Sequence, residues 1–216
     1  MGRGGVCISH GCDRQMSSII PRSDDRAAET LAADLAGYLL QLDEIDADTG
    51  KLLWGLTESQ FHWSPMAARW SISQCVVHLE IIGTRYLPSL DETIERAEAE
   101  NLWSRGPYRY GFLERWIVHA TEPPPRIRLR TPSSTRPPDD RLLADVTGNF
   151  SLLQDELRKR IRAANGLDLA RAKVTSPFVK ALKMGLGPCF AFLLAHERRH
   201  LWQARQVRNH EAFPPA

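Results

Sequence analysis

The chain has 216 residues, which is long enough to bury a hydrophobic core as one large domain or two small ones. Its 28 Lys and Arg residues nearly balance its 26 Asp and Glu residues, so the formal net charge is only +2. Proteins that bind nucleic acid usually present a dominant basic surface, and this composition gives no reason to expect such a partner.

Cysteine content and hydropathy indicate the compartment. The four cysteines stand at positions 7, 12, 75 and 189, which is not a disulfide framework and favours a reducing environment. No run of apolar residues approaches the ~20 that a membrane-spanning helix needs, and the first residues lack the apolar core of a secretion signal. We therefore expect a cytoplasmic protein without a membrane partner.

The N-terminal residues 1–24 are rich in Gly, Ser, Arg and Asp and show no periodicity, so we predict a disordered leader there. Residues 25–211 are then expected to form a single domain. Its first helix is predicted over residues 25–54, because apolar side chains recur at spacings of three and four residues. This stripe comprises Leu31, Leu35, Tyr38, Leu42 and Ile45.

The second helix is predicted to begin after Ser71. The Ser71 hydroxyl can accept a hydrogen bond from the first turn while Gln74, three residues later, reaches back, which is the pattern of a capping box. The helix is expected to extend to about residue 101, although Pro88 should kink or restart it. Residues 102–138 are rich in proline and are predicted to be irregular, with a short helix over residues 111–119.

The third helix is predicted to follow a cap at Asp139 or Asp140. After a linker over residues 167–186, Gly187-Pro188 opens a fourth helix, since proline is tolerated in the first turn. There is no strand signal longer than four or five residues. The sequence therefore predicts an all-α four-helix bundle, with long connections between helices 2 and 3 and between helices 3 and 4.

Three histidines are candidate metal ligands. His196 and His200 fall on the inward stripe of the last helix, and a spacing of four residues puts them on one face. His78 lies on the edge of the inward face of the second helix. Burying imidazoles costs free energy unless their nitrogens find partners, and a metal ion provides one for each ring. The alternative is that these are core histidines, each hydrogen-bonded to a neighbouring group.

The last helix also matches the short zinc-peptidase pattern His-Glu-x-x-His, as His196-Glu197-Arg198-Arg199-His200. The peptidase scaffold would place strands before this helix and a third ligand after it. No strands are evident, and only His210 follows. We therefore do not favour a peptidase.

Three stretches of the chain carry a resemblance to a known family. They are Leu53-Trp-Gly-Leu-Thr-Glu-Ser-Gln with Trp70-Ser-Ile-Ser-Gln-Cys-Val-Val-His78-Leu, then Gly185-Leu-Gly-Pro, then His196-Glu-Arg-Arg-His200-Leu-Trp-Gln-Ala-Arg. Together they resemble the DinB-like superfamily of metal-binding four-helix bundles over roughly residues 27–210, apart from the proline-rich middle. The resemblance implies that His78, His196 and His200 are the metal ligands.

The resemblance also implies a reaction class. It points to a divalent metal, zinc or nickel before iron, and to a low-molecular-weight thiol that the metal activates. We therefore expect a metal-dependent enzyme that acts on a small molecule by thiol transfer or by hydrolysis, with no catalytic residue assigned. The alternative is a non-catalytic metal-binding stress or interaction module. A homodimer is a further expectation.

Five charged residues near the candidate site have two interpretations each. Arg85, Arg199 and Arg205 either hold an anionic cofactor near the mouth of the site or are solvated surface charges. Glu80 and Glu197 either support the ligands from behind or form ion pairs on the surface.

Overall fold

The computed structural model describes residue 1 and residues 30–67, 69–124, 135–138 and 140–215. The chain divides into two units, Met1–Thr30 and Leu31–Ala216. The predicted leader over residues 1–24 lies outside the described residues except for Met1. The domain limits expected from the sequence therefore stay predictions.

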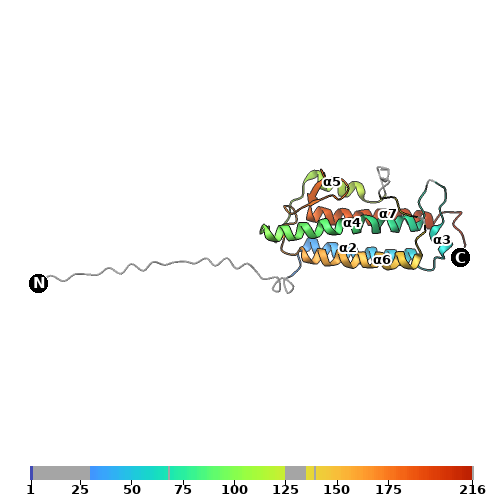
Figure 1. Ribbon diagram of the computed structural model, residues 1–216, viewed down its shortest axis with the longest axis horizontal. Helices are drawn as coiled ribbons and strands as arrows, with labels where there is room; N and C mark the ends of the chain where they lie inside the picture. The colour runs from blue at the N-terminus through green and yellow to red at the C-terminus, as the bar shows by residue number, and fades with distance from the viewer. Residues whose placement is uncertain (2–29, 68, 125–134, 139, 216) are drawn as a thin grey trace. The chain divides into compact units, whose positions relative to one another are not determined.

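The second unit is built on long helices that enclose one core (Figure 1). These are α2 (Ala33–Leu53), α4 (Ile72–Ala99), α6 (Leu143–Ala163) and α7 (Leu186–Arg208). Helix α4 packs against both α6 and α7, and α2 packs against the same two helices. The predicted all-α helical bundle is thereby confirmed. No helix in the described part of the chain is long and apolar enough to cross a membrane.

Shorter elements cover the ends and one side of the bundle. They are α3 (Glu58–His62), α5 (Phe112–Thr121), and two antiparallel strands, β1 (Lys173–Thr175) and β2 (Lys183–Gly185). Helix α5 corresponds to the short helix predicted over residues 111–119, and it packs against α7. The hairpin lies within the predicted linker 167–186, and its three-residue strands are too short to show a period of two in the sequence.

Pro88 does not restart the second helix as expected. Helix α4 runs without interruption from Ile72 to Ala99 with Pro88 inside it. Pro88 has no N–H to donate to the Thr84 carbonyl. Thr84 is exposed, so water can satisfy that carbonyl. Tyr86 and Leu90 on either side are buried in the core, which holds the helix together through the proline.

The expected cap of the third helix is also wrong. Helix α6 begins at Leu143, and its N-cap residue, Leu142, makes no side-chain hydrogen bond. Asp139 lies outside the described residues, and Asp140 precedes the helix without capping it. Instead the Glu58 carboxylate of α3 accepts the hydrogen bond of Leu143 N, at 3.0 Å. A negative group at a helix N-terminus is favourable whichever part of the chain supplies it.

The cap of α4 is the predicted one. Gln74 N donates to the Ser71 hydroxyl at 3.1 Å, and Ser71 N donates to the Gln74 side chain at 3.0 Å. This capping box satisfies two backbone donors that the helix itself cannot pair, and it begins the helix at a defined residue. The register of everything that α4 carries inward, His78 included, follows from this start.

Ser71→Ala is expected to lower the free energy of unfolding by about 1 kcal/mol, because it removes the acceptor for Gln74 N. Urea denaturation measures the change. Ser151→Ala, at an exposed position inside α6, is the matched control and should change stability by less than about 0.5 kcal/mol. Equal effects of the two substitutions would show that the cap contributes nothing.

Candidate metal centre

His78 reaches the core from the second turn of α4. Its side chain is almost fully enclosed, with 4% of the residue exposed. Trp70, the residue just before the cap, packs on this ring with centroids 4.9 Å apart, and on His200 with centroids 5.5 Å apart. The indole therefore fills the space behind two of the three imidazoles and limits how their rings can turn.

His196 and His200 reach the same point from α7. Their rings lie edge to face with centroids 4.6 Å apart, as the spacing of four residues predicts. The ring of His78 lies 5.3 Å from that of His196 and 4.7 Å from that of His200, between centroids. One ligand atom from each of the three lies within 4.8 Å of the other two. The structure thus brings together all three histidines predicted from the sequence.

A backbone carbonyl orients His78. Its Nδ1 lies 2.9 Å from the carbonyl oxygen of Thr135, a buried residue that follows α5 in the chain. A carbonyl oxygen can only accept, so Nδ1 is the protonated nitrogen and Nε2 carries the free lone pair. This is the usual way in which a ligating histidine is fixed in one tautomer by a group behind it.

Burial lowers the pKa of all three imidazoles. For His78 the hydrogen bond to Thr135 offsets part of that shift. Burial first, and then His78 and Arg199, lower the pKa of His196 to about 3. The pKa of His200 lies well below its ordinary value, because of burial and then because of the two neighbouring rings and Arg199. All three rings are therefore neutral at pH 7, and neutral imidazole is the form that binds a metal.

The spacing of the nitrogens fits one ion. His78 Nε2 and His196 Nε2 are 3.3 Å apart. Two nitrogens bound to one tetrahedral zinc ion at ~2.05 Å lie about 3.3 Å from each other. A direct hydrogen bond between these two rings would also give that distance, so the pair alone does not distinguish a metal site from a core histidine pair.

His200 carries a buried nitrogen without a hydrogen bond among the described residues. Its Nδ1 is buried and makes no hydrogen bond within the described part of the chain. The Gln203 side chain offsets a little of the pKa shift of His200 without reaching hydrogen-bonding geometry to this nitrogen. Hydrogen bonds among the described residues therefore leave this nitrogen unsatisfied. Separately, three neutral imidazoles are a donor set that suits a divalent metal.

The three arginines that we considered for an anionic cofactor have different surroundings. Arg205 pairs with Asp48 of α2 at 2.5 Å. Arg85 lies over the Phe178 ring, 5.6 Å from its centroid. Arg199 lowers the pKa of both His196 and His200, and burial lowers its own pKa. Of the three, Arg199 is the guanidinium that acts electrostatically on the cluster.

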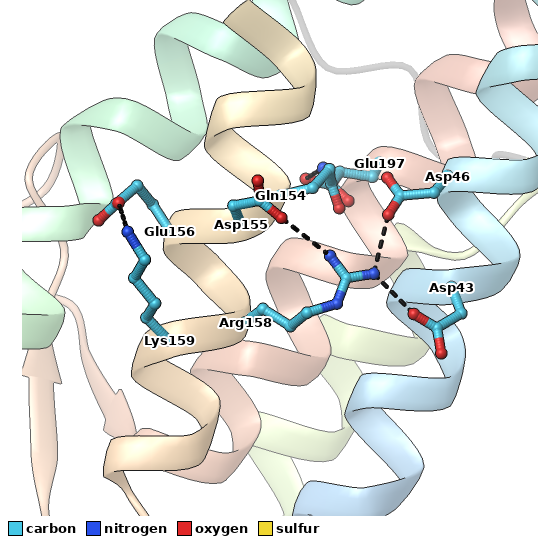
Figure 2. Close-up of polar contacts among 8 residues, drawn as sticks. All are labelled: Asp43, Asp46, Gln154, Asp155, Glu156, Arg158, Lys159 and Glu197. Carbon is cyan, nitrogen blue, oxygen red and sulfur yellow. Dashed lines mark hydrogen bonds and ion pairs between the residues drawn. The ribbon is translucent and has the colours of Figure 1, made fainter.

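Glu197 is not a surface charge. It is buried, with 4% of the residue exposed, and its Oε1 accepts a hydrogen bond from Gln154 Nε2 of α6 at 3.0 Å. Figure 2 shows this contact between α6 and α7, beside Arg158, which binds Asp43 and Asp46 of α2. Burial raises the pKa of Glu197 to about 8. A carboxyl group committed to Gln154 in this way does not play the part that the peptidase pattern would give it.

Glu80 is also buried, contrary to the expected surface ion pair. Its carboxylate lies 3.8 Å from Arg141, but burial still raises its pKa to about 7. Neither glutamate hydrogen-bonds to a histidine of the cluster in the described structure. The groups that do support the cluster are Trp70 and the Thr135 carbonyl. Trp70 lies in one of the motifs that carry the family resemblance, but that motif assigned it no role. A backbone carbonyl belongs to every residue type, so no sequence pattern could have pointed to Thr135.

Comparison with known proteins agrees with the bundle and the cluster. A family model described as the DinB superfamily matches residues 41–204. The chain belongs to the DinB superfamily. His78, His196 and His200 all lie within the matched span, which confirms the resemblance seen in the sequence. No curated protein and no solved structure matches the chain. That the three histidines are ligands stays a prediction.

The buried Glu197–Gln154 pair gives a stability prediction. Gln154→Leu removes the donor to Glu197 and leaves a buried carboxyl group without a partner, which should lower the free energy of unfolding by about 1–3 kcal/mol. The double variant Gln154→Leu/Glu197→Leu removes both polar groups and should recover most of that loss. Urea denaturation measures the stability of these two variants, of Glu197→Leu and of the parent protein, which together form a double-mutant cycle. A Gln154→Leu variant as stable as the parent would show that Glu197 finds another partner.

Proposed function

We propose that this protein is a metal-dependent enzyme that acts on a small molecule by thiol transfer or by hydrolysis. The observation that carries the proposal is the convergence of three neutral imidazoles from α4 and α7, with ligand atoms within 4.8 Å of one another. Membership of the DinB superfamily supports it, since the matched span contains all three.

His78, His196 and His200 would hold the metal. Imidazole suits zinc and nickel, and iron is the third candidate. A divalent ion bound there would supply Lewis acidity, which favours the deprotonated form of a thiol or of water and polarises a carbonyl group. Three protein ligands are typical of catalytic sites, because they leave a coordination position for the substrate. Thr135 and Trp70 would keep the ligand rings in place while the substrate exchanges.

The residues beside His196 suggest the substrate class. His196 is only partly buried, whereas the other two histidines are buried. Phe192 packs on its ring with centroids 5.7 Å apart, and Tyr86 packs on Phe192 at 6.1 Å. Arg199 adds a positive charge close by. An apolar aromatic wall next to one guanidinium favours an anionic, partly apolar small molecule, and a low-molecular-weight thiol with a carboxylate fits that description.

The alternative is a metal-binding stress or interaction module without turnover. The burial of His78 and His200 favours it, because it limits access to the cluster. A homodimer, a small-molecule substrate and a cytoplasmic location belong to the same proposal and rest on the sequence alone.

Each of His78→Ala, His196→Ala and His200→Ala is expected to abolish metal retention, because two imidazoles hold a divalent ion far more weakly than three. Elemental analysis of protein purified without a histidine tag measures this, with about one ion per chain expected for the parent. His119→Ala, at an exposed position on α5, is the matched control and should keep its metal. Parental metal content in any of the three variants would remove that histidine from the ligand set.

Turnover separates the two functions. The metal-loaded protein is assayed for thiol transfer with cysteine and an activated aryl halide, and for hydrolysis with a nitrophenyl ester. The double variant His196→Ala/His200→Ala gives the background rate. Product formation above that background supports an enzyme, and bound metal without turnover in either assay favours the non-catalytic module.

A further inference from the structure

The outward face of α5 is apolar. Phe112, Leu113 and Trp116 are 77%, 61% and 49% exposed, and all three belong to the first half of this ten-residue helix. The other large apolar side chains exposed in the described part of the chain stand apart in the sequence: Met1, Leu40, Trp54, Met66, Leu142, Leu152 and Val179. Single exposed apolar side chains are ordinary, whereas a cluster of them marks a contact surface.

The acidic groups of this helix are turned away from that face. Glu114 accepts hydrogen bonds from Lys173 Nζ at 2.9 Å and from Gly185 N at 2.7 Å, both in the β1–β2 hairpin. Glu122, which ends the helix, pairs with Arg198 of α7 at 3.0 Å. These contacts hold α5 against the bundle in one orientation and neutralise its carboxylates.

The exposed polar side chains that α5 itself places on the outward face are basic. Arg115 and His119 are exposed, and they follow Phe112 by three and seven residues, which places them on the same side of the helix. Arg109, just before α5, and Lys183, in the hairpin that Glu114 holds, are exposed as well. An apolar strip with the basic residues Arg115 and His119 beside it therefore lies on one side of α5, and Arg109 and Lys183 are exposed on the neighbouring segments.

We propose that α5 docks the protein on an anionic phospholipid surface. Phe112, Leu113 and Trp116 enter the interfacial region of the lipid, and Arg115 faces the headgroups. Phenylalanine, leucine and tryptophan beside basic residues are typical of helices that lie in a membrane interface, and anionic lipid complements the basic residues. A second copy of the chain suits this face less well, because a symmetric contact would bring Arg115 and His119 of both copies together. The expectation of no membrane partner rested on the lack of a long apolar run in the sequence, which does not bear on such a peripheral contact.

The test is sedimentation of the full chain with vesicles of phosphatidylglycerol and phosphatidylcholine, compared with vesicles of phosphatidylcholine alone. The parent protein is expected to bind the anionic vesicles and to release them as salt is raised. Phe112→Ser/Trp116→Ser should lower the partition coefficient at least ~10-fold. Leu40→Ser/Leu152→Ser, equally exposed on α2 and α6, is the matched control and should bind like the parent.

A second variant tests the charge and does not depend on the apolar residues. Arg115→Glu, at an exposed position, should lower the partition coefficient at least about fivefold. Thermal unfolding by circular dichroism verifies that each variant is folded. His196→Ala/His200→Ala should bind vesicles like the parent, so the docking surface and the proposed enzyme activity are tested independently.

Three results would overturn the proposal. The first is no sedimentation of the parent with anionic vesicles. The second is an equal loss of binding in the Phe112→Ser/Trp116→Ser and Leu40→Ser/Leu152→Ser variants. The third is a dimer of the parent, without lipid binding, that Phe112→Ser/Trp116→Ser dissociates, because the face would then be an interface between copies of the chain.

Discussion

The packing of α4 against α7 is the contact on which the rest of the structure depends. Apolar side chains of both helices fill the core between them, and at one level three imidazoles stand in their place. A buried imidazole nitrogen without a partner costs about 1–3 kcal/mol, so a core built for stability alone would favour leucine at these positions. The Thr135 carbonyl pairs one nitrogen and the contact between His78 and His196 another, but Nδ1 of His200 has no hydrogen-bond partner among the residues that the structure describes. Three imidazoles at this level are therefore a costly choice for a core, which supports the proposed metal site.

Local patterns in the sequence were enough to find the helices and the histidine pair of α7. The period of the apolar residues located α2, α4, α6 and α7, the Ser71–Gln74 pair located the start of α4, and a spacing of four placed His196 beside His200. That His78 meets them needed the resemblance to a family, because nothing in the spacing relates α4 to α7. The helices, the cap and the histidine pair are each carried by residues close together in the chain, where spacing alone determines which side chains share a face.

What the sequence did not predict depends on contacts between distant segments. The Glu58 carboxylate caps α6 from a different helix, and the Thr135 carbonyl orients His78 across 57 positions of the chain. Glu197 is the clearest case. It follows His196 directly in the sequence and therefore looks like a polar neighbour of the site. In the structure α6 covers it and supplies Gln154 as its hydrogen-bond donor. The sequence matches the zinc-peptidase pattern, but in the fold its glutamate forms a hydrogen bond between α6 and α7.

Helix α5 connects the candidate site to the surface of the protein. Its inner side ends at Glu122, which pairs with Arg198, and Arg198 stands between the two ligand candidates of α7 in the sequence. Arg198 also donates to Gln41 of α2 at 2.8 Å, so one guanidinium ties α5, α7 and α2 together. The outward side of the same helix carries the exposed apolar strip. The contacts of α5 with the bundle and its exposed apolar side chains lie on different sides of the helix, so the structural role of α5 and the docking role that we propose do not compete.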